Sequence, residues 1–330
     1  MEQNSSVSHQ TFLEFLPVSF FGGVMGLCGL CFSWRLAGRV WHISLMVSET
    51  IGWLAVLAFA ILTVAYLIKV IRHPILVRTE LTHPVSVCFF ATFIVSMLLI
   101  PGILFPYLPN IAIEMWLFAT FLMLLFAWYV LRSWIDNQQL SENAVPAWVL
   151  PIVGTLDVPI IGNHLPIRGV HEICLVFFGI GIIFSIILPT IIISRLLFQK
   201  PLPGNIQPTL LILTGPFALA FTGYEGLTGQ QDMIAAVFFY FNLFLLLLFG
   251  SKIFLLPKSC PFKATWWSVS FPLSAITIAA FHYSEHQTDL IHQLLAAFLL
   301  LVTSLVILYL LSQTLYRIWT GKFATLSFPG

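Results

Sequence analysis

Residues 84–104 read PVSVCFFATFIVSMLLIPGIL, and residues 114–131 read EMWLFATFLMLLFAWYVL. Both stretches are apolar, and each approaches the ~20 residues that a helix needs to cross a bilayer. Only the first contains proline, and Pro101 lies in its interior, where it removes a helical hydrogen bond. At membrane depth the freed backbone groups are tolerated only against other protein or a water-filled cavity. We therefore expect the first stretch inside the protein and the second against lipid.

This pairing of a broken and an unbroken apolar stretch occurs five times along the chain. The broken stretches cover residues 15–34, 84–104, 146–162, 208–224 and 264–282, and their partners cover 51–68, 114–131, 173–196, 233–253 and 290–316. The interior prolines of the broken stretches are Pro17, Pro101, Pro151, Pro159, Pro216 and Pro272. The unbroken stretches contain only Pro189.

The broken stretches begin near residues 15, 84, 146, 208 and 264, at intervals of 69, 62, 62 and 56 residues. An even number of helices per repeat makes every copy enter the membrane from the same side, so these are parallel repeats. The pattern predicts an all-α polytopic membrane protein of ten transmembrane helices in five helical hairpins. Five kinked helices would form an inner ring around a central pore, within an outer ring of five. The alternative is that the kinks only ease helix packing, since Gly and Pro are common in membrane helices.

The composition supports a membrane protein, with 59% hydrophobic and 8% charged residues and a mean hydropathy of +0.98. We expect a cytoplasmic segment at residues 1–14, one transmembrane pore domain at 15–319 and a cytoplasmic tail at 320–330. The formal net charge of +1 argues against a nucleic-acid partner. No cofactor or metal is expected, because the five cysteines form no ligand set and no catalytic motif is present.

Basic residues predict that both termini are cytoplasmic. With that orientation, cytoplasmic segments hold 11 of the 14 basic residues, namely Lys69, Arg72, Arg78, Arg132, Arg195, Lys200, Lys252, Lys258, Lys263, Arg317 and Lys322. The opposite side holds Arg35, Arg39 and Arg168. Cytoplasmic loops of membrane proteins are enriched in Lys and Arg, which is the bias seen here.

Asp157 is the only acid in the broken stretches, which contain no Lys or Arg, so the expected conduit is close to neutral. An intramembrane carboxylate is rare and costly unless it is paired or hydrated. Asp157 is therefore interpreted either as a pH-sensitive or proton-coupling group in the pore, or as an acid hydrogen-bonded by Thr155 or a neighbouring helix. An outer cluster of Glu225, His282, Glu285 and His286 is expected to be solvated, although it could serve a proton relay.

Phe271 immediately precedes Pro272 in the segment Trp266-Trp267-Ser268-Val269-Ser270-Phe271-Pro272-Leu273. Proline removes the amide that would bond the Ser268 carbonyl and disfavours helical geometry at the preceding residue. A bulky ring is thereby placed at a helix break.

This segment resembles the slow-type anion channels and the bacterial tellurite-resistance TehA proteins, which are grouped with C4-dicarboxylate and malate transporters. The resemblance includes Leu16-Pro17-Val18-Ser19-Phe20-Phe21-Gly22, Leu150-Pro151 and Thr214-Gly215-Pro216, and it extends over essentially the whole transmembrane part. It implies ten helices in five hairpins, homotrimers with one pore per subunit, and location in the plasma (inner) membrane. Its permeant partners would be small anions such as chloride, nitrate or dicarboxylates.

By motif match, the resemblance makes Phe271 the gate, with Gly22 leaving room near the ring. The other residues expected to line the pore or support the gate are Phe20, Phe21, Thr155, Thr214, Ser268 and Ser270, with helix breaks at Pro17, Pro151, Pro216 and Pro272. Asp157 departs from the small or hydroxyl residue usual at its position. A proton-coupled dicarboxylate carrier remains the alternative to an anion channel, and an enzyme is not expected.

Overall fold

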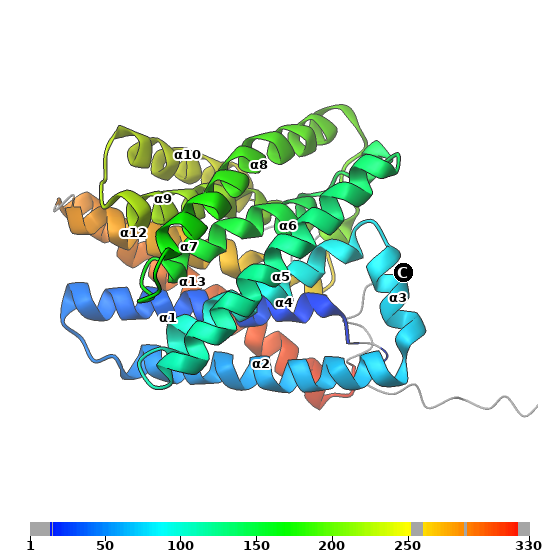
Figure 1. Cartoon of the computed structure of the whole chain (residues 1–330), viewed down its shortest axis with the longest axis horizontal. Coiled ribbons are helices and arrows are strands. Elements are labelled where there is room, and N and C mark those ends of the chain that lie inside the picture. Colours follow the sequence, from blue (N-terminus) through cyan, green and yellow to red (C-terminus); the bar gives the residue numbers. More distant parts are fainter. Residues whose placement is uncertain (1–13, 15, 252–259, 287–288, 323–330) are drawn as a thin grey trace, which may run out of the picture.

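The computed structural model describes residues 14, 16–251, 260–286 and 289–322, and every regular element in this part of the chain is helical. Most helices run roughly along the long axis of the molecule (Figure 1). Nine helical stretches of the described part are long and apolar enough to cross a membrane. The tenth expected span, Pro146–Gly162, is apolar but shorter. The regular structure of these described residues is thus all helical, as in a membrane protein with several spans.

The unbroken stretches form long, exposed helices. They are α2 (Met46–Arg72), α5 (Pro109–Asp136), α8 (Val170–Phe198), α10 (Met233–Gly250) and α13 (Leu290–Trp319). Their most apolar windows are only 11 to 33% buried inside the protein, whereas those of the four long broken spans are 78 to 89% buried. The expected burial of the broken stretches is therefore confirmed. The residues expected at the end of the fourth unbroken stretch, with Lys252 and Lys258, lie outside the described part.

Each broken stretch begins with a 3₁₀ helix that passes into α-helix. The pairs are η2 (Val18–Phe20) with α1 (Phe21–Trp41), η3 (Ser86–Phe89) with α4 (Phe90–Leu104), η7 (Gly204–Thr214) with α9 (Gly215–Thr228), and η9 (Ala264–Val269) with α12 (Ser270–His286). The third stretch is divided further into η5 (Pro146–Val149), α6 (Leu150–Val153), η6 (Gly154–Leu156) and α7 (Asp157–Gly162).

Hydroxyl side chains in these 3₁₀ segments, or in the first turn of the α-helix that follows, bond the backbone of the 3₁₀ segment. Thr92 Oγ1 donates to the Phe89 carbonyl at 2.6 Å, and Ser268 Oγ donates to the Thr265 carbonyl at 2.6 Å. Each bond spans three residues, and it gives the buried or half-buried hydroxyl a partner within its own stretch. Proline and local hydroxyl groups together make irregular helix tolerable inside the protein.

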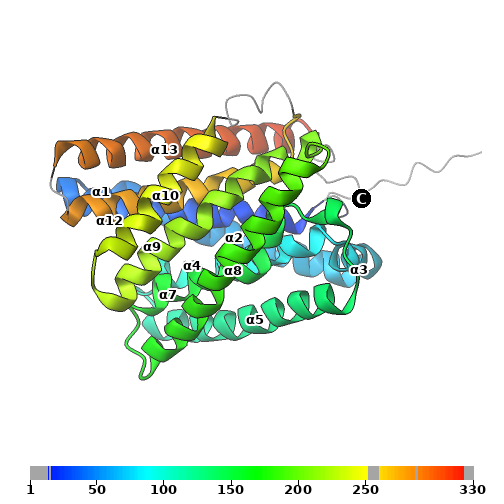
Figure 2. The ribbon, with the colours of Figure 1, turned by 90° about the horizontal axis from the view of Figure 1, so that it is seen from above.

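The buried segments contact one another in a closed cycle. Helix α1 contacts α4, α4 contacts α7, α7 contacts α9, α9 contacts α12, and α12 contacts α1. Each buried helix also contacts the long helix that follows it, as α1 contacts α2 and α12 contacts α13. The start of α1 and the end of α13 lie at the same end of the bundle (Figure 2).

The contact between α1 and α12 is close because glycine faces serine. A Cβ atom added to Gly26 would lie 2.5 Å from the Cβ of Ser270, and one added to Gly29 would lie 2.4 Å from the Cβ of Ser274. Ser274 Oγ donates to the Gly26 carbonyl at 3.3 Å, which links a side chain of α12 to the backbone of α1. Small residues allow this approach, as is common between membrane helices.

The short helix α3 (Pro74–Thr82) was not expected from the sequence. It lies across one end of the bundle (Figure 1). Glu80 of α3 forms an ion pair with Lys69, whose ammonium is buried and also donates to the Leu16 carbonyl at 2.7 Å. The hydroxyl of Tyr66 donates to the second Glu80 oxygen at 2.7 Å. A buried charge is tolerated when it is paired in this way, and the pair fixes α3 to the start of the first buried stretch.

Candidate functional site

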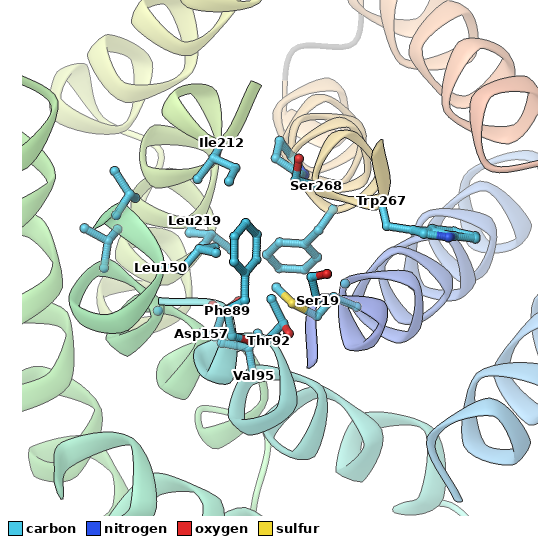
Figure 3. Close-up of a pocket in the computed structure, with 18 of the residues that line it drawn as sticks. Ser19, Phe89, Thr92, Val95, Leu150, Asp157, Ile212, Leu219, Trp267 and Ser268 are labelled. Carbon is cyan, nitrogen blue, oxygen red and sulfur yellow. Dashed lines mark hydrogen bonds between the residues drawn. The ribbon is translucent and has the colours of Figure 1, made fainter. Parts of the chain in front are cut away.

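A central cavity of about 50 Å³ lies among the five buried stretches. Each stretch contributes lining residues, for example Ser19 from η2, Phe89 from η3, Asp157 from α7, Ile212 from η7 and Ser268 from η9 (Figure 3). The volume accommodates only a few water molecules, since one water needs about 10 to 15 Å³ of such space. The cavity is therefore a constriction on the axis of the bundle.

Phe271 lines this cavity at the start of α12, and its side chain is 9% exposed. Pro272 follows within the first turn of the helix, where amides have no intrahelical partner and proline is tolerated. The expected helix break is thus the junction between η9 and α12. Pro151 and Pro216 also lie in the first turn, as the second residues of α6 and α9, and Pro17 precedes η2.

A second ring in the cavity, that of Phe89, was missed by the sequence analysis. Phe89 is the last residue of η3, is 5% exposed and points into the cavity (Figure 3). No proline is adjacent to it, so no local motif distinguishes it from the other 30 phenylalanines. Only the hydroxyl of Thr92, which bonds the Phe89 carbonyl, marks the turn.

Asp157 begins α7 and is 1% exposed, with its carboxyl group at the cavity (Figure 3). Its Oδ1 atom is buried without a hydrogen-bond partner in the described part of the chain. Thr155 does not bond it, because Thr155 Oγ1 donates to the Ile152 carbonyl at 2.8 Å and faces Gly181 of α8. The expected local partner was therefore wrong.

Of the seven expected lining residues, Gly22 and Ser268 line the cavity. The other five, which are Phe20, Phe21, Thr155, Thr214 and Ser270, are buried elsewhere. Phe21 faces away from the axis, with its ring centroid 6.0 Å from that of Phe59 in α2. Ser270 lies in the contact with α1 and donates to the Gly22 carbonyl at 3.3 Å. Thr214 Oγ1 donates to the Leu211 carbonyl at 2.8 Å.

A larger cavity of about 550 Å³, here called the vestibule, lies at the end of the bundle opposite α3. Its charged and titratable lining residues are Arg35, Arg39, His164, Glu225 and His282. The sequence analysis ended the first buried stretch at Trp34, whereas α1 continues to Trp41 and places both arginines in the wall.

Two of the vestibule charges are paired. Arg35 bonds Glu49 of α2 at 2.9 Å and donates to the Gly102 carbonyl at 2.7 Å. Glu225 accepts from His282 Nδ1 at 3.0 Å. The expected solvated cluster is thus partly ordered: Glu225 and His282 are paired and line the vestibule.

Comparison with known proteins shows the family. Residues 16–315 match the family described as SLAC1, voltage-dependent anion channels. The S-type anion channel SLAH2 of Arabidopsis thaliana is 24% identical over 322 residues, covering 94% of this chain and 61% of that protein. The tellurite resistance protein TehA homolog of Haemophilus influenzae is 24% identical over 312 residues, covering 93% of this chain and 92% of that protein.

The guard cell S-type anion channel SLAC1 of Arabidopsis thaliana is 22% identical over 325 residues. The chain spans 48 to 61% of the length of SLAC1 and its plant relatives SLAH2 and SLAH3. The resemblance inferred from the sequence is confirmed, and the names of these relatives do not favour a dicarboxylate carrier. Because the match includes all five stretches around the central cavity, the chain belongs to the SLAC1/TehA family of anion channels and transporters.

Proposed function

We propose that the protein is an anion channel whose pore follows the axis of the buried stretches and is closed at the central cavity by Phe271. The observation that carries the proposal is the cavity lining, in which all five stretches meet around the ring of Phe271. Asp157 is the only ionisable side chain among the described residues that line the cavity. A narrow, nearly neutral constriction opposes ions sterically and by dewetting until its rings move.

In this proposal the chain crosses the membrane ten times, with Pro146–Gly162 as the fifth span. The contact cycle of α1, α4, α7, α9 and α12 supports an inner ring of five, each followed by an outer helix as one hairpin repeat. Residues 15–319 would form the single pore domain. Small monovalent anions such as chloride and nitrate would pass, because the constriction is small and offers hydroxyl groups and helix starts in place of a strong charge.

The test is purified full-length protein reconstituted in planar bilayers and liposomes under chloride, nitrate or malate gradients. The proposal expects discrete current steps carried by chloride or nitrate without a proton gradient. Malate uptake that requires a proton gradient and gives no current steps would show that the protein is a coupled carrier and not a channel.

The orientation is a separate prediction. The helix ends near Asn110 and Gln230 lie at the end of the bundle that is farther from α3, and both side chains are exposed. We expect the protein to lie in the plasma membrane with both termini in the cytoplasm. A cysteine placed at either position should then react with an impermeant thiol reagent added outside the cell. The buried native cysteines, such as Cys28 and Cys174, leave little background. If these cysteines were labelled only from the cytoplasmic side, the predicted orientation would be wrong.

The assembly is expected to be a homotrimer with one pore per subunit. The support is the resemblance to the family, together with the mostly exposed outer helices that a neighbouring subunit would cover in part. Native mass spectrometry in mild detergent should give three copies of the 37.1 kDa chain. A stable monomer or dimer, in detergent that preserves the anion current on reconstitution, contradicts this prediction.

A further inference from the structure

Lys69 is a buried cation on a helix that is otherwise mostly exposed. Its side chain is 1% exposed, whereas the other buried residues of α2 are small and lie in the first half of the helix, namely Ser48, Gly52 and Ala55. A charge inside a membrane protein is costly unless it is paired, and a lysine near the end of a span can extend to water instead. The burial of Lys69 is therefore explained by what its ammonium binds.

The ammonium of Lys69 joins three segments of the chain. It donates to the Leu16 carbonyl at 2.7 Å, at the entry to the first buried stretch, and it forms the ion pair with Glu80 of α3. These two contacts of Lys69 are here called the anchor. At the junction of α2 and α3, His73 Nε2 lies 3.9 Å from Glu14 Oε1. The entry segment and α3 are thus joined at two places.

The anchored carbonyl lies close to the wall of the central cavity. It immediately precedes Pro17, whose ring restricts the backbone that leads into η2, and Ser19 of η2 lines the cavity. Thr92 Oγ1, which donates to the Phe89 carbonyl at 2.6 Å, also lies 3.3 Å from the Val18 carbonyl. This hydroxyl connects η2 to the turn that carries the second ring of the cavity. A shift of η2 is therefore transmitted to that ring.

The far end of α3 leads directly into η3. His83 follows α3, and its Nδ1 atom accepts from the amides of Val85 and Ser86 at 3.2 and 3.1 Å, which closes the turn between the two helices. Helix α3 also packs against η3. It is thus joined to both of the segments that place Ser19 and Phe89 in the cavity wall.

We propose that Lys69 is a positioning residue for the gate. Its bond to the Leu16 carbonyl, with Glu80 as the fixed partner, holds η2 in the closed constriction, and the hydroxyl of Thr92 extends this restraint to the ring of Phe89. The anchor is formed in an arrangement whose central cavity measures only about 50 Å³, so it stabilises that closed arrangement. The inference rests on the proposed channel function and adds a residue outside the cavity that controls it.

The first experiment measures the standing chloride conductance per amount of reconstituted full-length protein. Lys69→Met retains the apolar stem and removes the ammonium. It should raise the conductance roughly tenfold, as expected for loss of a hydrogen bond from a charged group. In Lys69→Met/Phe89→Ala the lysine substitution should add little to the effect of Phe89→Ala, because both act through the same ring. Arg132→Met, which breaks an exposed ion pair with Asp136 on α5, is the matched control and should leave the conductance unchanged.

Lys69→Met/Glu80→Gln separates positioning from stability. Removing one partner of a buried ion pair is destabilising, whereas replacing both with uncharged groups is often neutral. The double variant should therefore recover most of the Tm that Lys69→Met loses. It should keep the raised conductance, because the Leu16 carbonyl still lacks the ammonium. A conductance that returns to the wild-type value together with the Tm would show that the pair serves stability alone, and the proposal would be wrong.

The native thiol of Cys88 provides a readout that needs no current. Cys88 lies in η3 beside Phe89, and it is fully buried, as is Cys174 of α8, which faces Gly162 at the end of the third buried stretch. In detergent, Lys69→Met should raise the rate at which N-ethylmaleimide alkylates Cys88 roughly tenfold, because local opening of η3 becomes easier. The rate at Cys174 should stay unchanged. Both rates are measured by mass spectrometry of the full-length protein.

The two readouts distinguish this inference from the channel proposal. Faster alkylation of Cys88 alone, with no current in any variant, supports the anchor and removes the channel. Currents in Phe271→Ala, with neither the conductance nor the Cys88 rate changed by Lys69→Met, support the channel and overturn the anchor. An equal rise in rate at Cys88 and Cys174 would show general loosening of the protein and would also overturn the anchor.

Discussion

Phe271→Ala should open a standing anion conductance in reconstituted protein. The ring lies in a cavity of about 50 Å³, and its removal widens the constriction where the five buried stretches meet. Each tenfold rise in conductance corresponds to about 1.4 kcal/mol removed from the barrier, and we expect a rise of at least that size. Phe271→Leu keeps an apolar branch in the cavity and should raise the conductance less. The measurement is macroscopic chloride and nitrate current per amount of reconstituted protein.

Phe221→Ala is the matched control for this experiment. Phe221 is also on a buried helix and is fully buried, but it packs against Phe239 and Tyr283 and does not line the central cavity. Its truncation should cost about 3 to 5 kcal/mol of stability without added current. If Phe271→Ala behaves as this control does, losing stability and gaining no conductance, Phe271 is a core residue and not the gate.

Phe89 adds a second aromatic ring to the proposed gate at Phe271. Because Phe89 also points into the cavity, Phe89→Ala should give a smaller opening than Phe271→Ala, and the double variant should exceed either. Non-additive conductances would show that the two rings obstruct the same passage.

Asp157→Asn should remove a dependence of anion flux on pH. An ionised carboxylate about 4 Å from a passing anion would oppose it by about 4 kcal/mol at an effective dielectric constant of about 20. In the wild type the flux should therefore fall as the pH rises through the titration of Asp157, since the charged form repels anions. The amide is neutral at every pH, so the variant should keep the high, acid-side flux. Flux is measured by anion efflux from liposomes over a series of pH values.

Glu114→Gln provides the control for the carboxylate substitution. Glu114 is exposed on α5, away from both cavities, so the same change there should leave the pH profile intact. A profile in Asp157→Asn equal to that of the wild type, with a lower yield of folded protein, would assign Asp157 a structural role.

The sequence predicts which helices are buried because proline and glycine determine where irregular backbone occurs, and such backbone is not tolerated against lipid. It also brings Phe271 and Asp157 to the cavity, since both lie beside helix starts. The orientation of neighbouring side chains was harder to predict. A 3₁₀ turn advances 120° per residue and an α-helix 100°, so each short 3₁₀ segment rotates the direction of the side chains after it. Thr155 and Phe21 therefore point away from the axis, toward α8 and α2.

The vestibule was missed for an energetic reason. Hydropathy falls at Arg35, which suggests the end of a span, but α1 continues because Glu49 and the Gly102 carbonyl satisfy the guanidinium. Both partners of Arg35 lie outside α1 in the sequence, so no local sequence pattern indicates these contacts. The division of the third broken stretch into four short elements was equally hidden, because Pro151 and Pro159 indicate a break but not its geometry.

The glycine and serine contact between α1 and α12 also determines when the protein can finish folding. The Ser270 hydroxyl and the Gly22 carbonyl that it bonds are separated by 248 residues, so α1 is synthesised long before the helix that packs against it. Until then the face of α1 at Gly26 and Gly29 lacks the serine side chains of α12 that pack against it in the folded protein. Chains interrupted before α12 should therefore remain open bundles that membrane quality control can recognise, which makes completion of the last hairpin the committing step of biogenesis.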